Sequence, residues 1–176
     1  MKAPVQSTDH LPFVQNRWRN VALLNGVSGL THLAQFGVIY TLLVMWLESR
    51  GMITSRIGMV VVSVWVGMLI GNLLTPMLLT RFNARTIALF SCVCTALWAF
   101  LVPNLPSTEF FTWLGAAALF GFLVGLRWVS VEGWVFELID GPHKGRLIAV
   151  HESIMYAAQA LGPVCIGVVG RRCQSA

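Results

Sequence analysis

The chain contains five apolar runs of roughly 20 or more residues, separated by short links that hold most of its charge. A helix of about 20 residues, rising about 1.5 Å per residue, crosses a hydrocarbon core of about 30 Å. Charged residues make up only 11% of the 176 residues, against about 25% in a typical soluble domain. A soluble fold of this size could not cover itself with so few charges, so we expect a membrane protein. The runs lie near residues 21–47, 57–80, 86–105, 110–136 and 146–170.

These runs predict an all-α fold, a polytopic transmembrane helix bundle with five spans. We expect residues 1–20 to form a cytoplasmic N-terminal tail and residues 171–176 a short C-terminal tail. Basic residues favour the cytoplasmic side of a membrane, and an inner N-terminus places seven of them inside against four outside. The inner set is Lys2, Arg17, Arg19, Arg81, Arg85, Lys144 and Arg146, and the outer set is Arg50, Arg56, Arg171 and Arg172. This count predicts a cytoplasmic N-terminus, and we expect a multi-pass protein of a bacterial plasma (inner) membrane.

Several function classes lack support in the sequence. The net charge of +5 is not gathered into a basic stripe, which argues against nucleic-acid binding. No HExxH or GxSxG motif occurs, and His151–Glu152 lacks a second metal-ligand partner at helical spacing. We therefore expect no enzyme activity, no metal and no cofactor. The cysteines are interpreted as small core residues, since no CxxC occurs: Cys92, Cys94, Cys165 and Cys173.

Small residues recur at helical spacing on two of the runs. On the second run they occur every fourth residue, at Ser63, Gly67, Gly71 and Thr75, and on the fourth at Gly121 and Gly125. Such faces let the backbones of two helices approach closely. They predict packing faces of a helix bundle and indicate nothing about a substrate.

The first run carries a polar stripe. Its members are spaced by three, four and three residues and therefore share one helical face: Asn25, Ser28, His32 and Gln35. Polar side chains facing lipid would be costly, so the stripe is expected to face a partner helix or a water-filled cavity. Hydrogen bonds that hold helices together are the alternative to a cavity.

Arg127 interrupts the fourth run at a depth close to the membrane midplane. It lies about 15 Å along the helix from Glu137, and His32 lies at a comparable depth in the first run. An arginine at the centre of a bilayer costs roughly 2.5–3.5 kcal/mol on insertion scales. Arg127 is therefore expected to face an aqueous cavity or an anionic partner.

Three more ionisable residues lie at matched depth on the fourth and fifth runs. Glu132 precedes Pro142 by ten residues, and His151 and Glu152 follow it by nine and ten. If the two helices are antiparallel neighbours, Glu132 and His151 could meet and form a titratable pair near neutral pH. The alternative is that Glu132 reaches the headgroup layer and pairs with a basic residue of the next loop, Lys144 or Arg146.

Two loops and one helical element carry a family resemblance. The loop in "PMLLTRFNARTIAL" resembles the G-x-x-x-D-R-x-G-R-R motif of the major facilitator superfamily, with Arg81 at its first basic position and Arg85 at its last. The motif's aspartate is absent. The segment "GPHKGRLIAV" resembles the family's R-G-R loop before the fifth helix, and Gly162–Pro163 resembles its antiporter element. The R-G-R positions are occupied by Lys144, Gly145 and Arg146.

The resemblance covers the N-terminal half of such a transporter, from about residue 15. It implies a solute site near the midplane between two six-helix halves that rock during alternating access. The expected partners are the lipid bilayer, an unidentified small solute, protons and a C-terminal half that this chain lacks. On this interpretation the chain is truncated and forms part of a proton-coupled or facilitative carrier. The alternatives are a small scaffold or accessory subunit that transports nothing and a non-functional remnant.

Overall fold

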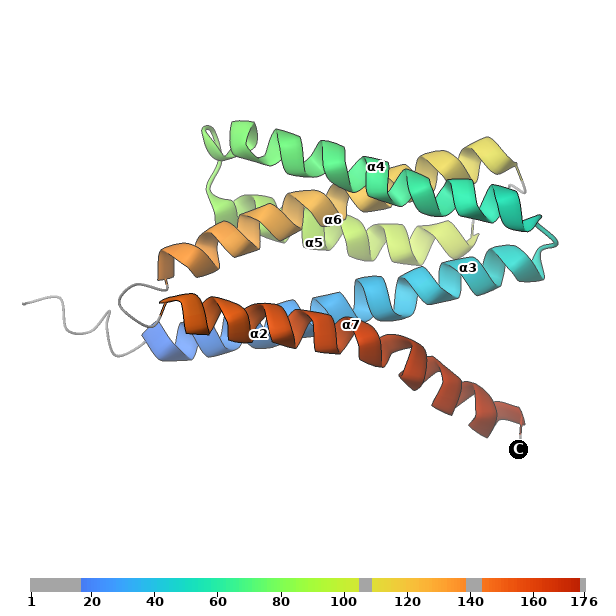
Figure 1. Cartoon of the computed structure of the whole chain (residues 1–176). Coiled ribbons are helices and arrows are strands. Elements are labelled where there is room, and N and C mark those ends of the chain that lie inside the picture. Colours follow the sequence, from blue (N-terminus) through green and yellow to red (C-terminus); the bar gives the residue numbers. More distant parts are fainter. Residues whose placement is uncertain (1–16, 105–108, 139–143, 175–176) are drawn as a thin grey trace, which may run out of the picture.

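The computed structural model describes residues 17–104, 109–138 and 144–174, and every element in these ranges is a helix (Figure 1). The predicted all-α class is therefore confirmed. The elements in chain order are α2 (Arg17–His32), η1 (Leu33–Ile39), α3 (Tyr40–Ser49), α4 (Thr54–Leu79), α5 (Ala84–Leu101), η2 (Val102–Asn104), α6 (Phe110–Leu138) and α7 (Lys144–Gln174).

The segments α2, η1 and α3 follow one another without a break and form the first long helical body, which runs the length of the bundle (Figure 1). Its middle part, η1, is a π-helix, and it buries Gln35, Phe36 and Gly37 in succession. These residues face different neighbours, since Phe36 packs against Trp128 and Gly37 lies against Gly162. A π-helical stretch is wider, and such stretches are frequent at functional sites.

The tightest helix packing joins α4 and α6. A Cβ atom added at Gly67 would lie 1.9 Å from the carbonyl oxygen of Ala118, and one added at Gly121 would lie 1.9 Å from that of Val64. Only glycine permits this backbone approach, so the packing faces predicted on the second and fourth runs are confirmed. The contact fixes α6 against α4 and thereby sets which face of α6 is turned toward α2.

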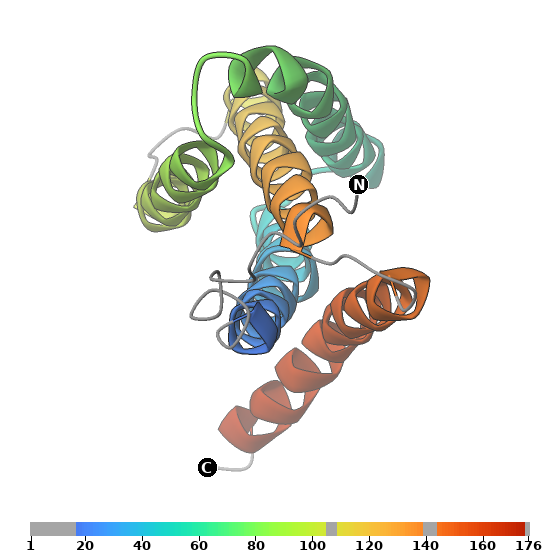
Figure 2. The same ribbon diagram turned by 90° about the vertical axis from the view of Figure 1, so that its left-hand side faces the viewer.

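The last helix, α7, packs on α2 and η1, on the side of this body that faces away from α4 and α5 (Figure 2). Gly37 of η1 and Gly162 of α7 meet so closely that a Cβ at Gly162 would lie 2.0 Å from the Gly37 Cα. Beyond this contact the C-terminal part of α7 diverges from the bundle (Figure 1). The buried residues of α7 in its described part are His151, Met155 and Gly162, which lie on one face.

Four described segments are long and apolar enough to cross a membrane: Val21–Ser49, Thr54–Leu79, Ala84–Leu101 and Phe110–Phe136. The fifth long helix, α7, is not among them, and its apolar stretch is interrupted by His151, Glu152 and Gln159. A fifth span therefore stays a prediction. Two of the predicted tail boundaries differ from the helix ends, since α2 begins at Arg17 and α7 extends to Gln174. Polar residues can continue a helix beyond its apolar stretch, whereas hydropathy marks only that stretch.

Candidate functional site

Five polar side chains from three helical bodies are buried inside the bundle, and His32 among them lies within electrostatic range of both Arg127 and His151. Ser28 and His32 come from α2, Gln35 from η1, Arg127 from α6 and His151 from α7. None is more than 5% exposed, and Arg127 is 2% exposed. We call these five residues the polar cluster. The prediction that the first-run stripe faces the bundle interior is confirmed for Ser28, His32 and Gln35, whereas Asn25 is half-buried.

Arg127 is held by a threonine of the neighbouring helix. Its Nη1 donates a hydrogen bond to Thr31 Oγ1 across 2.9 Å. The Thr31 hydroxyl in turn lies 2.9 Å from the carbonyl oxygens of Val27 and Ser28, so it donates to the α2 backbone while it accepts from the arginine. This contact points the guanidinium of α6 at α2.

The two histidines of the cluster use their ring nitrogens in the same way. His32 Nδ1 lies 3.1 Å from the Ser28 carbonyl oxygen, and His151 Nδ1 lies 2.6 Å from Asn25 Oδ1. Both acceptors require a proton on Nδ1, which leaves Nε2 of each ring as the free nitrogen. Nε2 of a neutral ring accepts a hydrogen bond, and Nε2 of a protonated ring donates one.

Many polar atoms of the cluster have no hydrogen-bond partner in the described structure. They are Ser28 Oγ, His32 Nε2, Gln35 Oε1, Arg127 Nε, Arg127 Nη2 and His151 Nε2. A buried polar group without a partner costs about 1–3 kcal/mol, and a buried charge without compensation costs several kcal/mol. Side chains that served only to hold helices together would satisfy one another. The cluster is therefore suited to receive water or a polar solute.

Glu132 and Glu152 lie beside the cluster rather than in it. Glu132 accepts a hydrogen bond from Trp128 Nε1, one turn earlier on α6, and lies within electrostatic range of Glu152 and Arg127. The structure has no hydrogen bond between Glu132 and His151, since His151 Nδ1 bonds Asn25 and its Nε2 has no partner among the described residues, so their titratable pair stays a prediction. Five residues along a helix correspond to a rotation of about 140°, so Glu132 cannot share the face of Arg127.

The predicted loop residues lie at one end of the bundle. Arg81 follows α4, Arg85 lies in the first turn of α5, and Lys144, Gly145 and Arg146 form the first turn of α7. Figure 1 shows that the link from α4 to α5 and the start of α7 lie at the same end as the start of α2. These five residues are all exposed, and the structure has no ion pair between Glu132 and Lys144 or Arg146, all of which it describes.

Two contributors to this region were not singled out from the sequence. Thr31 lies next to His32 and three residues after Ser28, so its position beside the stripe could have indicated it. Trp128 packs edge-on against His32, with ring centroids 4.9 Å apart, and also against Phe36 at 5.8 Å. These aromatic rings form an apolar wall on one side of the polar cluster.

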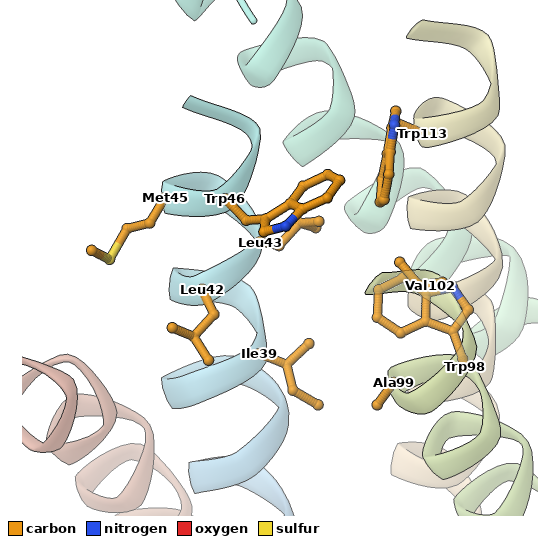
Figure 3. Close-up of a pocket in the computed structure, with 9 residues that line it drawn as sticks. All are labelled: Ile39, Leu42, Leu43, Met45, Trp46, Trp98, Ala99, Val102 and Trp113. Carbon is orange, nitrogen blue, oxygen red and sulfur yellow. The ribbon is translucent and has the colours of Figure 1, made fainter. Parts of the chain in front are cut away.

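A large apolar cavity of the described structure lies elsewhere. It has a volume of about 460 Å³ and is lined by α3, α5, η2 and α6 together with the end of η1 (Figure 3). Its walls are apolar and rich in tryptophan: Ile39, Leu42, Trp46, Trp98, Val102 and Trp113 among others. The indole Nε1 of Trp98 is bonded to the carbonyl oxygen of Ala116. Because the polar cluster contributes nothing to this pocket, we do not assign the candidate site to it.

Comparison with known proteins gives one consistent result. Residues 24–172 match the family described as Major Facilitator Superfamily. An uncharacterized MFS-type transporter of Yersinia enterocolitica is 28% identical over 132 residues, which cover 75% of this chain and 34% of the relative. The uncharacterized MFS-type transporter YcaD of Escherichia coli is 28% identical over 158 residues, which cover 87% of this chain and 39% of the relative. The chain thus spans little more than a third of the length of these relatives. No solved structure matches it.

Proposed function

The chain belongs to the major facilitator superfamily, a family of membrane transporters rather than enzymes, and on that premise we propose that its polar cluster is the solute site of a secondary transporter. The chain supplies α2, η1, α6 and α7 to this site, and it acts as part of a larger carrier that moves a small solute by alternating access. The observation that carries the proposal is the set of unpartnered polar atoms around Arg127. Ionisable residues inside a membrane mark solute and ion pathways by default.

A proton-coupled cycle is the form of transport that these side chains favour. The titratable groups in and beside the cluster are His32, His151, Glu132, Glu152 and Cys92, the last of which lies within electrostatic range of Arg127. Proton binding at either imidazole ring would change the charge next to the solute. We expect transport by the whole carrier to vary with pH and Glu132→Gln to alter that profile. A profile that Glu132→Gln leaves unchanged would remove Glu132 from the proton pathway.

The solute pathway is testable on the chain itself by thiol labelling. In a background with all four cysteines replaced by alanine, Ser28→Cys places a thiol in the cluster. Leu30→Cys places one at almost the same depth on the outer face of α2, where Leu30 is 67% exposed and is expected to face the lipid. A water-soluble methanethiosulfonate reagent needs a thiolate, and thiols ionise poorly in hydrocarbon. We expect the thiol of Ser28→Cys to react and that of Leu30→Cys to remain unmodified.

The opposite result has a clear meaning. If both thiols are inert in membranes but react after solubilisation in denaturant, the cluster is sealed from water. It would then hold helices together and the solute-site proposal would fail.

A further inference from the structure

The guanidinium of Arg127 presents one free edge. Its Nη1 is occupied by Thr31 Oγ1, whereas Nε and Nη2 have no partner in the described structure. The N–H groups of Nε and Nη2 lie side by side on one edge of the planar guanidinium and point in the same direction. This is the edge that accepts the two oxygens of a carboxylate in a bidentate pair.

The described acidic side chains do not fill this edge. Glu132 lies within electrostatic range of Arg127 but bonds Trp128, and no carboxylate of the described ranges bonds the two free nitrogens. An arginine keeps its charge, so the cluster has one permanent positive charge with no bonded anionic partner. His32 and His151 each add a free Nε2 to the same buried region.

The depth of Arg127 indicates whether an anion bound to it would be a solute or a lipid headgroup. Arg127 lies eleven residues before the end of α6 at Leu138, which is about 16 Å along the helix. Half of a hydrocarbon core is about 15 Å, so Arg127 lies near the midplane, far from the phosphate layer. A charged group that meets it there arrives through water inside the bundle.

We propose that the polar cluster binds an oxyanion of the carboxylate type, with its two oxygens on Nε and Nη2 of Arg127. This rests on the proposed function and names the chemical class of the solute. Thr31 is a positioning residue, because its contact with Nη1 leaves the opposite edge of the guanidinium open. His32 and His151 would accept from a hydroxyl of the solute when neutral and donate to its oxygens when protonated.

The test uses the purified chain in nanodiscs and three small probes at equal ionic strength. Acetate carries the proposed group, acetamide has the same shape without the charge, and chloride has the charge without the two oxygens. We expect acetate alone to raise the thermal unfolding midpoint in a saturable way. Arg127→Lys keeps the charge but loses the paired donors, and it should weaken acetate binding by at least about tenfold. Thr31→Val keeps the guanidinium and should weaken acetate binding by a smaller factor.

Three results with the unsubstituted chain would overturn the proposal. They are equal shifts with acetate and acetamide, equal shifts with acetate and chloride, and no shift with acetate at all. Unchanged acetate binding in a folded Arg127→Lys variant would also overturn it. If Arg127→Lys does not fold, unchanged acetate binding in Thr31→Val would overturn the proposal instead. Labelling of Ser28→Cys needs no ligand, so a water-accessible cluster without acetate binding would reject the oxyanion while leaving the solute pathway standing.

Discussion

A methyl group added at Gly67 should separate α4 from α6. The Cβ of Gly67→Ala would lie 1.9 Å from the Ala118 carbonyl oxygen and 2.8 Å from the Ala118 carbonyl carbon, where ordinary contact begins at 3.4 Å. The oxygen contact is therefore short by about 1.5 Å, and both partners are backbone or fixed to it, so neither can turn aside. The helices must move apart by about that distance.

The cost of this separation is that of an overpacked interface, about 1–3 kcal/mol. Gly58→Ala on the same helix is the matched control, because a Cβ at Gly58 meets no atom within 4 Å. The control should be neutral or slightly stabilising, since glycine lowers helix stability by roughly 0.5–1 kcal/mol relative to alanine. We would measure thermal unfolding of both variants in the same detergent.

The Gly67→Ala substitution should also affect the polar cluster, because the α4–α6 contact sets the orientation of α6 and therefore of Arg127. Gly67→Ala should weaken acetate binding as well as lower the unfolding midpoint. If Gly67→Ala and Gly58→Ala unfold at the same temperature, the close approach of α4 and α6 does not exist in the protein.

Three further outcomes are expected. A membrane-impermeant thiol reagent added outside intact cells should label a cysteine placed at Gly51 and not one placed at Asn83; labelling at Asn83 would reverse the orientation. Gly162→Ala should lower the unfolding midpoint more than Gly167→Ala. The Cβ of Gly162→Ala would lie 2.0 Å from the Gly37 Cα, whereas a Cβ at Gly167 meets nothing within 4 Å. Equal midpoints would argue against the α7–η1 contact. Glu132→Gln should strengthen acetate binding a few-fold, because it removes a negative charge within electrostatic range of Arg127; weaker binding would mean that Glu132 supports the site.

The fold follows largely from local patterns in the sequence. Each predicted apolar run lies on one helical body, and the small-residue faces of the second and fourth runs form the α4–α6 contact. The loop and helix motifs indicate the major facilitator superfamily, which the match of residues 24–172 confirms. These features repeat at helical spacing, so they can be recognised without knowing how the helices are arranged.

The side-chain partners between helices could not be predicted in the same way. The depth of Glu132 and His151 follows from counting residues, but the direction each faces depends on the rotation of its helix. That rotation is fixed by distant backbone contacts such as Gly67 with Ala118. The sequence therefore predicts the depth of both residues, while the partners Asn25 and Trp128 emerge only from the structure.

The π-helical conformation of η1 also could not be predicted from the spacing of polar and apolar residues. The spacing of the polar stripe predicts an unbroken α-helix through Gln35, and the first-run residues fit that pattern well. The close approach of Gly37 to Gly162 of α7 lies within the widened segment. Nothing local to the first run indicates that contact.

The most direct measurement of the central claim is the rate at which the introduced thiol of the Ser28→Cys variant reacts with and without acetate. If the polar cluster is a water-accessible site for an oxyanion, acetate should slow the reaction in a saturable way, and acetamide at the same concentration should not. Introducing Arg127→Lys should abolish most of this protection. A rate that acetate leaves unchanged, or that acetate and acetamide lower equally, would contradict the assignment of this cluster as an oxyanion site.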